Sequence, residues 1–199
     1  MITKLTYSTL QRGATVLFDQ QGPVSFVLSG VLGLVDSDWL RMLRKPWHVG
    51  FIVDKETILN ALDKKQELAD HINWDVLNHP ENWWICESLA GGITVNPVSI
   101  YDLRRLRFYR WHQRPQSREE DTKYLIDHIG LPYDPWVYLW TTIATILSKL
   151  FHLNIGVWTN PAFMCWENLE EYNNIRGKTL CTRYRTIMIT DICRALGLM

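Results

Sequence analysis

Two apolar segments decide the fold of this chain: Trp47-His48-Val49-Gly50-Phe51-Ile52-Val53 and Trp83-Trp84-Ile85-Cys86-Glu87-Ser88. Apolar runs of this length are typical of buried β-strands, yet the first carries a histidine and the second a carboxylate. Far downstream, Cys165 lies in a segment that predicts a helix. Histidine, carboxylate and thiol are the three groups of a cysteine-nucleophile site, and His48, Glu87 and Cys165 are therefore the candidate catalytic residues.

The two strands are expected to pair antiparallel, with His48 directly opposite Glu87. Directly opposed side chains have Cβ atoms about 4.5–5.5 Å apart, which brings the carboxylate within hydrogen-bond reach of the imidazole. A carboxylate in this place would orient the imidazole and stabilise its charged form. Because strand side chains alternate, the same register places three opposed pairs on one face. These pairs are His48 with Glu87, Gly50 with Ile85, and Ile52 with Trp83.

Length and composition limit the class of protein. The 199 residues suit a single domain over 1–199, with the polar stretch 55–80 expected as an insertion between the two strands. Lys plus Arg and Asp plus Glu number 21 each, so no specific nucleic-acid partner is expected. The first residues lack the apolar run of a signal peptide, which predicts a cytoplasmic location; membership of a larger particle such as a virion is the alternative.

The four cysteines are Cys86, Cys165, Cys181 and Cys193, and they form no CxxC pair and no close group with histidine. This spacing argues against structural zinc and gives no disulfide framework, so neither a metal nor another cofactor is expected. Cys86 lies on the strand face opposite Glu87, which predicts a core residue. Cys165 follows Asn160-Pro161, a typical helix start, and a position near a helix N-terminus favours thiolate. The alternative for Cys165 is a buried thiol that acts as a small apolar side chain.

Turn and capping signals divide the rest of the chain. Further strands are expected at 13–18, after the Gly91-Gly92 hairpin signal, and at 105–111. Ser117-Arg118-Glu119-Glu120 has the capping-box pattern, and Gly130 is expected to end the helix that begins there. Other helices are predicted over about 136–151, from Pro161 onward, and over 190–196. Together these elements predict an α+β fold in which an antiparallel sheet packs against helices.

Five segments occur in an order that is typical of one known family. They are Gly13-Ala14-Thr15-Val16-Leu17-Phe18, Trp47-His48-Val49-Gly50, Glu87-Ser88-Leu89-Ala90-Gly91-Gly92-Ile93, Gly130-Leu131-Pro132-Tyr133-Asp134 and Phe163-Met164-Cys165-Trp166-Glu167-Asn168-Leu169. Over nearly its whole length the chain resembles the circularly permuted papain-like hydrolases of the NlpC type. The resemblance is to the YiiX/YaeF-like cysteine amidases in particular, with lecithin:retinol acyltransferase as a distant relative. In that family the histidine comes first, on a strand, and the cysteine comes last, on a helix.

The resemblance implies a permuted papain-like fold and hydrolysis of an amide or ester through a thioester on Cys165. His48 would activate the thiol and Glu87 would orient His48, with a cell-wall peptide or an N-acyl lipid as substrate. Trp47 and Trp166 stand where the family usually has small polar residues, so the substrate pocket is expected to differ. The alternatives are an inactive binding or structural component of a larger assembly, such as a virion, and an acyltransferase acting on lipid.

Two further segments are candidate substrate-binding surfaces. The apolar run 136–151 is too short and too interrupted to span a bilayer, so it predicts a core helix, with lipid or acyl-chain contact as the alternative. Residues 104–111 mix arginine with aromatic side chains, as nucleic-acid binders do. The neutral net charge instead favours a strand with one solvated face; binding of an anionic headgroup or a peptide carboxylate is the alternative there.

Overall fold

A computed structural model describes residues 2–19, 46–72, 75–89, 91–111, 117–133 and 189–198, together with single helical residues at 143, 147, 151, 169, 172 and 173. Six strands in these ranges form one sheet in the order β1-β6-β2-β3-β4-β5, and every neighbouring pair is antiparallel. The strands are β1 (Ile2–Leu5), β2 (Thr15–Asp19), β3 (Pro46–Asp54), β4 (Trp83–Leu89), β5 (Gly92–Pro97) and β6 (Leu106–Trp111). The predicted α+β fold with an antiparallel sheet is confirmed; β1, at one edge of the sheet, was not predicted.

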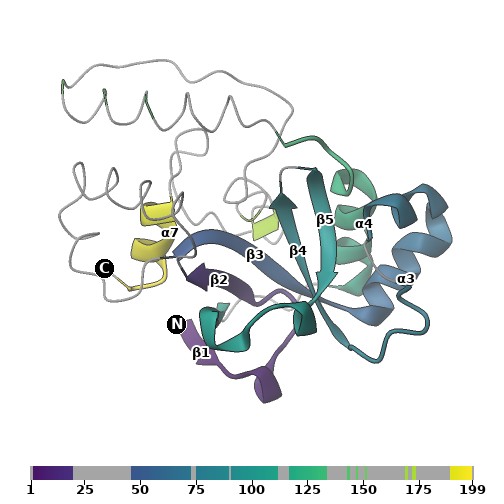
Figure 1. Ribbon diagram of the computed structural model, residues 1–199, viewed down its shortest axis with the longest axis horizontal. Coiled ribbons are helices and arrows are strands. Elements are labelled where there is room, and N and C mark those ends of the chain that lie inside the picture. The colour runs from purple at the N-terminus through teal and green to yellow at the C-terminus, as the bar shows by residue number, and fades with distance from the viewer. Residues whose placement is uncertain are drawn as a thin grey trace.

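Helices α3 (Lys55–Lys64) and α4 (Arg118–His128) pack against each other beside the sheet, and α7 (Ile189–Ala195) contacts β3 near the C-terminus (Figure 1). Short 3₁₀ helices cover Tyr7–Thr9, Gln66–His71, Val98–Ile100 and Leu103–Arg105. The capping box predicted at Ser117 is present, and Gly130 follows the C-terminus of α4 with a positive φ of 84°. These helix signals were therefore read correctly from the sequence, as was the short helix near the C-terminus.

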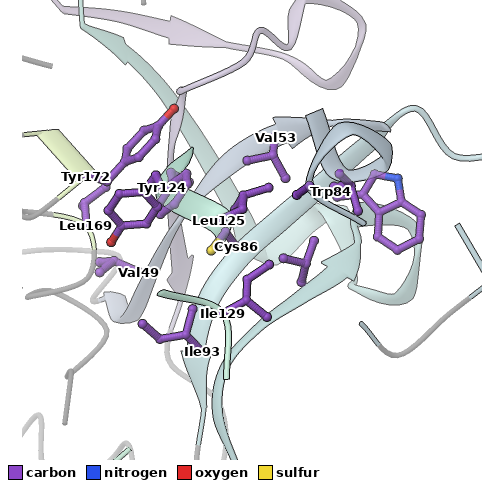
Figure 2. Packing of buried hydrophobic residues seen from close by; sticks show 14 of the residues in the cluster. Val49, Val53, Trp84, Cys86, Ile93, Tyr124, Leu125, Ile129, Leu169 and Tyr172 are labelled. Atoms are coloured by element: carbon purple, nitrogen blue, oxygen red, sulfur yellow. The ribbon is translucent and has the colours of Figure 1, made fainter. Parts of the chain in front are cut away.

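The core lies on both faces of the sheet, because strand side chains alternate. The larger apolar cluster fills the face toward the helices (Figure 2), and Cys86 belongs to it, as predicted. Its members include Leu17, Val49, Phe51, Val53, Trp84, Cys86, Tyr124, Leu125, Leu169, Tyr172 and Ile192. The smaller apolar cluster covers the other face. It consists of Leu5, Leu10, Ala14, Val16, Phe18, Ile52, Ile85, Val98, Leu106 and Phe108.

The predicted register of the two central strands is wrong by two residues. In the structure Glu87 pairs with Gly50, Ile85 with Ile52, and Trp83 with Asp54. A shift of two leaves every side chain on its predicted face, so the alternation of the sequence cannot distinguish the two registers. The connection between the strands selects the observed register. The Lys55 N–H donates to the Asn82 carbonyl at 3.0 Å and closes the ladder where β3 ends and β4 begins.

The 55–82 connection begins with a residue that serves two elements. Asp54 ends β3 and caps α3, where its carboxylate accepts the Thr57 N–H at 2.9 Å. Helix α3 then buries Ile58 and Ala61 in the larger cluster. That the stretch 55–80 is an insertion within a single domain stays a prediction.

Main-chain bonds join the end of α4 to the β4–β5 hairpin. The hairpin has the predicted place, with Leu89 paired to Gly92. Gly130 N–H donates to the Ile93 carbonyl and Ile93 N–H donates to the Leu131 carbonyl, each at 2.9 Å. A Cβ atom at Gly92, where φ is 112°, would lie 2.6 Å from the Leu131 carbonyl oxygen. Glycine is therefore required at this position by both backbone conformation and space.

The expectation that β6 has one solvated face is wrong over residues 106–109, where both faces of the strand are buried, whereas Arg110 is exposed. Leu106, Arg107, Phe108 and Tyr109 are all buried. Arg107 forms an ion pair with Asp19 of β2 at 2.8 Å, so its charge is neutralised inside the fold. The exposed arginines that precede the strand lie beside Asp102, which pairs with Arg104 at 3.0 Å.

Candidate active site

His48 and Glu87, the two site residues that the structure describes, are in direct contact. The His48 Nε2 atom lies 2.8 Å from the Glu87 Oε2 atom. Both side chains are buried, with 5% and 1% of the residue surface exposed. The predicted contact between histidine and carboxylate is thus confirmed, although the register that was to produce it is wrong.

Gly50 makes this contact possible in the observed register. Glu87 pairs with Gly50 rather than with His48, so its side chain must lean along the strand to reach the histidine two residues away. Diagonal neighbours on adjacent strands lie within reach of long side chains. A Cβ atom at Gly50 would lie 3.3 Å from the Glu87 Cβ and 2.8 Å from both Ile85 Cγ2 and the Cys86 carbonyl oxygen. The missing side chain therefore allows close strand approach and leaves room for the carboxylate.

Two further residues, Asn96 and Tyr101, complete the surroundings of the carboxylate. The Glu87 Oε1 atom accepts a hydrogen bond from Asn96 Nδ2 at 2.9 Å and another from the Tyr101 hydroxyl. Sequence reasoning missed both. Asn96 had a signal, since it is a polar residue within the apolar run that forms β5. Tyr101 had none, because it follows a short 3₁₀ helix outside any strand or periodic pattern.

Asn96 and Tyr101 both donate to the Glu87 carboxylate, which is the arrangement an ionised carboxylate requires. An ionised carboxylate only accepts, so the His48 nitrogen that faces it, Nε2, carries a proton. Burial, the negative charge of Glu87 and the hydrogen bond to it raise the pKa of Tyr101 far above its usual value of 10.0. Tyr101 therefore remains a neutral donor at any ordinary pH.

Aromatic rings hold the imidazole in place. The Phe18 ring centroid lies 4.9 Å from that of His48 and 5.2 Å from that of Tyr101. Trp47 packs on the histidine at a centroid distance of 5.4 Å and is 40% exposed. Trp47 is thus a partly exposed ring beside the histidine.

Cys165, together with Asn160, Pro161 and Trp166, lies outside the described residues. The described residues that follow it most closely are Leu169, Tyr172 and Asn173, which are helical and buried. Tyr172 stacks on Phe51 of β3 at 3.7 Å between ring centroids. The chain after Cys165 is therefore anchored on the strand that carries His48, but on the opposite face, because residues 48 and 51 point to opposite sides.

The other cysteines and the other candidate surfaces give a mixed result. Cys86 and Cys193 are both buried in the larger cluster, while Cys181 lies outside the described residues.

Of the run 136–151, the structure describes Ile143, Leu147 and Phe151, all in helical backbone. Ile143 is 38% and Phe151 62% exposed, so these two side chains do not belong to the core. Lipid contact through 136–151 stays a prediction.

Within the described part of the chain, no helix is long and apolar enough to cross a membrane, and no group of His, Cys, Asp or Glu side chains is arranged to hold a metal ion. Comparison of the chain with models of known protein families and with curated protein sequences finds no match.

Proposed function

We propose that the protein is a cysteine-dependent hydrolase of circularly permuted papain-like fold, with Cys165 as nucleophile. The observation that carries this proposal is the buried contact between His48 Nε2 and Glu87 Oε2 at 2.8 Å. A histidine oriented by a buried carboxylate is the acid–base half of a nucleophilic site. The chain order of histidine, carboxylate and cysteine supports the assignment of the other half.

The chemistry follows from which histidine nitrogen is engaged. Because Glu87 accepts the proton on Nε2, the basic nitrogen of neutral His48 is Nδ1. Nδ1 takes the proton from the Cys165 thiol, and the thiolate attacks the substrate carbonyl carbon to form a tetrahedral intermediate. As this collapses to a thioester, the His48 imidazolium gives its proton to the departing amine or alkoxide.

The second half of the reaction regenerates the enzyme. His48 removes a proton from water, the resulting hydroxide attacks the thioester, and the acid product leaves as the C–S bond breaks and the imidazolium returns its proton to the Cys165 sulfur. Glu87 stabilises the imidazolium in both halves, and a backbone amide near Cys165 is the expected donor to the oxyanion. If an alcohol or amine takes the place of water, the same steps give an acyltransferase.

The proposal makes one demanding geometric requirement. His48 lies near the Pro46 end of β3 and points away from the larger cluster in which Tyr172 is packed. The proposed mechanism therefore requires Cys165 to lie on the side of β3 that carries His48, not on the side that Tyr172 covers. If Cys165 does not reach His48, the histidine–carboxylate pair is a purely structural contact. The protein is then a binding or structural component rather than an enzyme.

The test compares turnover in cysteine variants on a panel of cell-wall peptides, N-acyl lipids and simple esters. Cys165→Ala should abolish turnover, whereas Cys86→Ala, Cys181→Ala and Cys193→Ala should retain it, with folding checked by thermal melts. Iodoacetamide at mildly acidic pH should label Cys165 first, because only an activated thiol is largely thiolate there. Equal labelling of all the cysteines, together with no turnover on any substrate, would refute the hydrolase proposal in favour of a binding or structural component.

A further inference from the structure

The carboxylate that orients His48 is itself held by two donors that lie in other parts of the chain. Asn96 is on β5 and donates from Nδ2 to Glu87 Oε1 at 2.9 Å. Tyr101 lies between the 3₁₀ helices Val98–Ile100 and Leu103–Arg105 and donates its hydroxyl to the same oxygen. Both act on the oxygen that does not face the histidine, so neither touches the imidazole through this contact.

We propose that Asn96 and Tyr101 are positioning residues that fix the orientation of Glu87 and lower the pH at which the His48–Glu87 pair gives up its proton. The inference deepens the proposed hydrolase function and, for its catalytic meaning, rests on it. The effect would keep His48 available as a neutral base at a lower pH than the carboxylate alone allows.

The orientation part follows from burial. Glu87 is 1% exposed and Asn96 2%, so water does not readily replace the amide donor, whereas Tyr101 is only partly buried. A buried carboxylate oxygen without a donor is costly, and the side chain would turn to find one. Phe18 packs against both residues: its ring meets that of Tyr101 edge-on at 5.2 Å between centroids and lies 4.9 Å from that of His48.

The direction of the proton effect follows from the charge of the pair. When His48 is protonated, the imidazolium neutralises most of the carboxylate charge, and the bonds to Oε1 are worth less. When His48 loses its proton, the pair carries a net negative charge in a buried site, and charge-assisted bonds to Oε1 become stronger. The two donors therefore stabilise the deprotonated pair more than the protonated one, and the pair titrates as a unit at a lower pH.

The charged residues that follow Phe18 and Tyr101 in the sequence are each paired with an arginine. The His48 imidazole contacts Phe18 of β2 and Glu87 of β4. Tyr101, in the segment after β5, packs on the same Phe18 ring. Asp19, which follows Phe18, is paired with Arg107 at 2.8 Å. Asp102, which follows Tyr101, is paired with Arg104 at 3.0 Å. Glu87 is the carboxylate placed in direct contact with His48 by the 2.8 Å hydrogen bond.

The test is a pH titration of the His48 ring by nitrogen NMR on the full chain. It is made in a Cys165→Ala background, so that a thiol does not titrate together with the imidazole. Tyr101→Phe keeps the ring that packs on Phe18 and removes only the hydroxyl. Its titration midpoint should rise by about one pH unit relative to the background protein. Asn96→Leu, which is similar in size but has no donor, should move the midpoint in the same direction.

The chain offers a matched control in Tyr7, whose hydroxyl donates to a different carboxylate, Glu81. Tyr7→Phe removes a tyrosine–glutamate bond of the same type away from the site and should leave the His48 midpoint unchanged. An unchanged or lowered midpoint in folded Tyr101→Phe and Asn96→Leu overturns the inference.

The readout separates this inference from the proposed function, because it follows the histidine and needs no substrate. If the midpoint rises as expected while Cys165 is unreactive and turnover is absent, the positioning network stands and the hydrolase proposal falls. If Cys165 supports turnover while the midpoint does not move, the hydrolase stands and the network is only structural.

Discussion

Replacing Gly50 by alanine tests how the fold brings the candidate site together. The added Cβ would lie 2.8 Å from both the Cys86 carbonyl oxygen and Ile85 Cγ2, and 3.3 Å from the Glu87 Cβ. The carbonyl belongs to the backbone of the paired strand β4 and cannot move without opening the β3–β4 ladder. Overpacking of this kind typically costs about 1–3 kcal/mol. In a domain of this size that corresponds to a lowering of the melting temperature by roughly 2–12 °C.

The same substitution should also loosen the contact between His48 and Glu87, because the methyl group takes the space over which the carboxylate leans. Urea unfolding measures the stability, and nitrogen NMR of the His48 ring reports whether Nε2 still donates to a carboxylate. Gly91→Ala is the matched control, since a Cβ there meets nothing within 4 Å, and it should change neither property. A Gly50→Ala protein as stable as the Gly91→Ala protein, with an unaltered His48 spectrum, would show that this account of the register is wrong.

Three other substitutions give distinct readouts. Glu87→Gln should place its carbonyl oxygen toward the two donors at Oε1 and its amide group toward His48. The amide then donates to Nε2, so the proton of the neutral ring should move to Nδ1 and activity should fall. An unchanged histidine tautomer by NMR would contradict this. Tyr172→Phe removes a buried hydrogen bond to Asp121 at 2.7 Å. The free energy of unfolding, measured by urea titration, should fall by about 1–3 kcal/mol, and an unchanged value would contradict this. Burial raises the pKa of Asp54, but hydrogen bonds at the start of α3 and a neighbouring arginine outweigh it, so the net shift is downward from 3.8. A lowered folded-state pKa gives stability that is complete above the unfolded value of 3.8 and is lost as the pH falls through the lower folded-state value, so Asp54→Asn should weaken the acid dependence of the melting temperature below about pH 4.

The strands were predictable because the sequence pattern fixes which face a side chain occupies. Alternation placed His48 and Glu87 on one face and Cys86 on the other, and the structure agrees. Alternation has a period of two, so it cannot separate registers that differ by two residues. What decides between them is the closure at Lys55 and Asn82 together with the space at Gly50, and both are properties of the paired strands rather than of either segment.

The rest of the site was harder to predict for a different reason. Asn96 and Tyr101 reach Glu87 only because the β4–β5 hairpin and the segment after β5 fold back over the same face. Local sequence carries little information about such a return. The burial of Arg107 could not be predicted from 104–111 for a similar reason, because its ion-pair partner is Asp19, far away in the chain.

The central claim is that Cys165 and His48 meet, and cross-linking with dibromoacetone tests it most directly. This reagent alkylates a reactive thiol and then captures a nucleophilic nitrogen within a few ångströms of the sulfur. The account predicts a single Cys165–His48 cross-linked peptide by mass spectrometry in the folded protein. It also predicts that His48→Ala abolishes the cross-link, whereas Tyr7→Phe leaves it intact. Alkylation of Cys165 without any link to His48, in a protein that remains folded, would contradict the account.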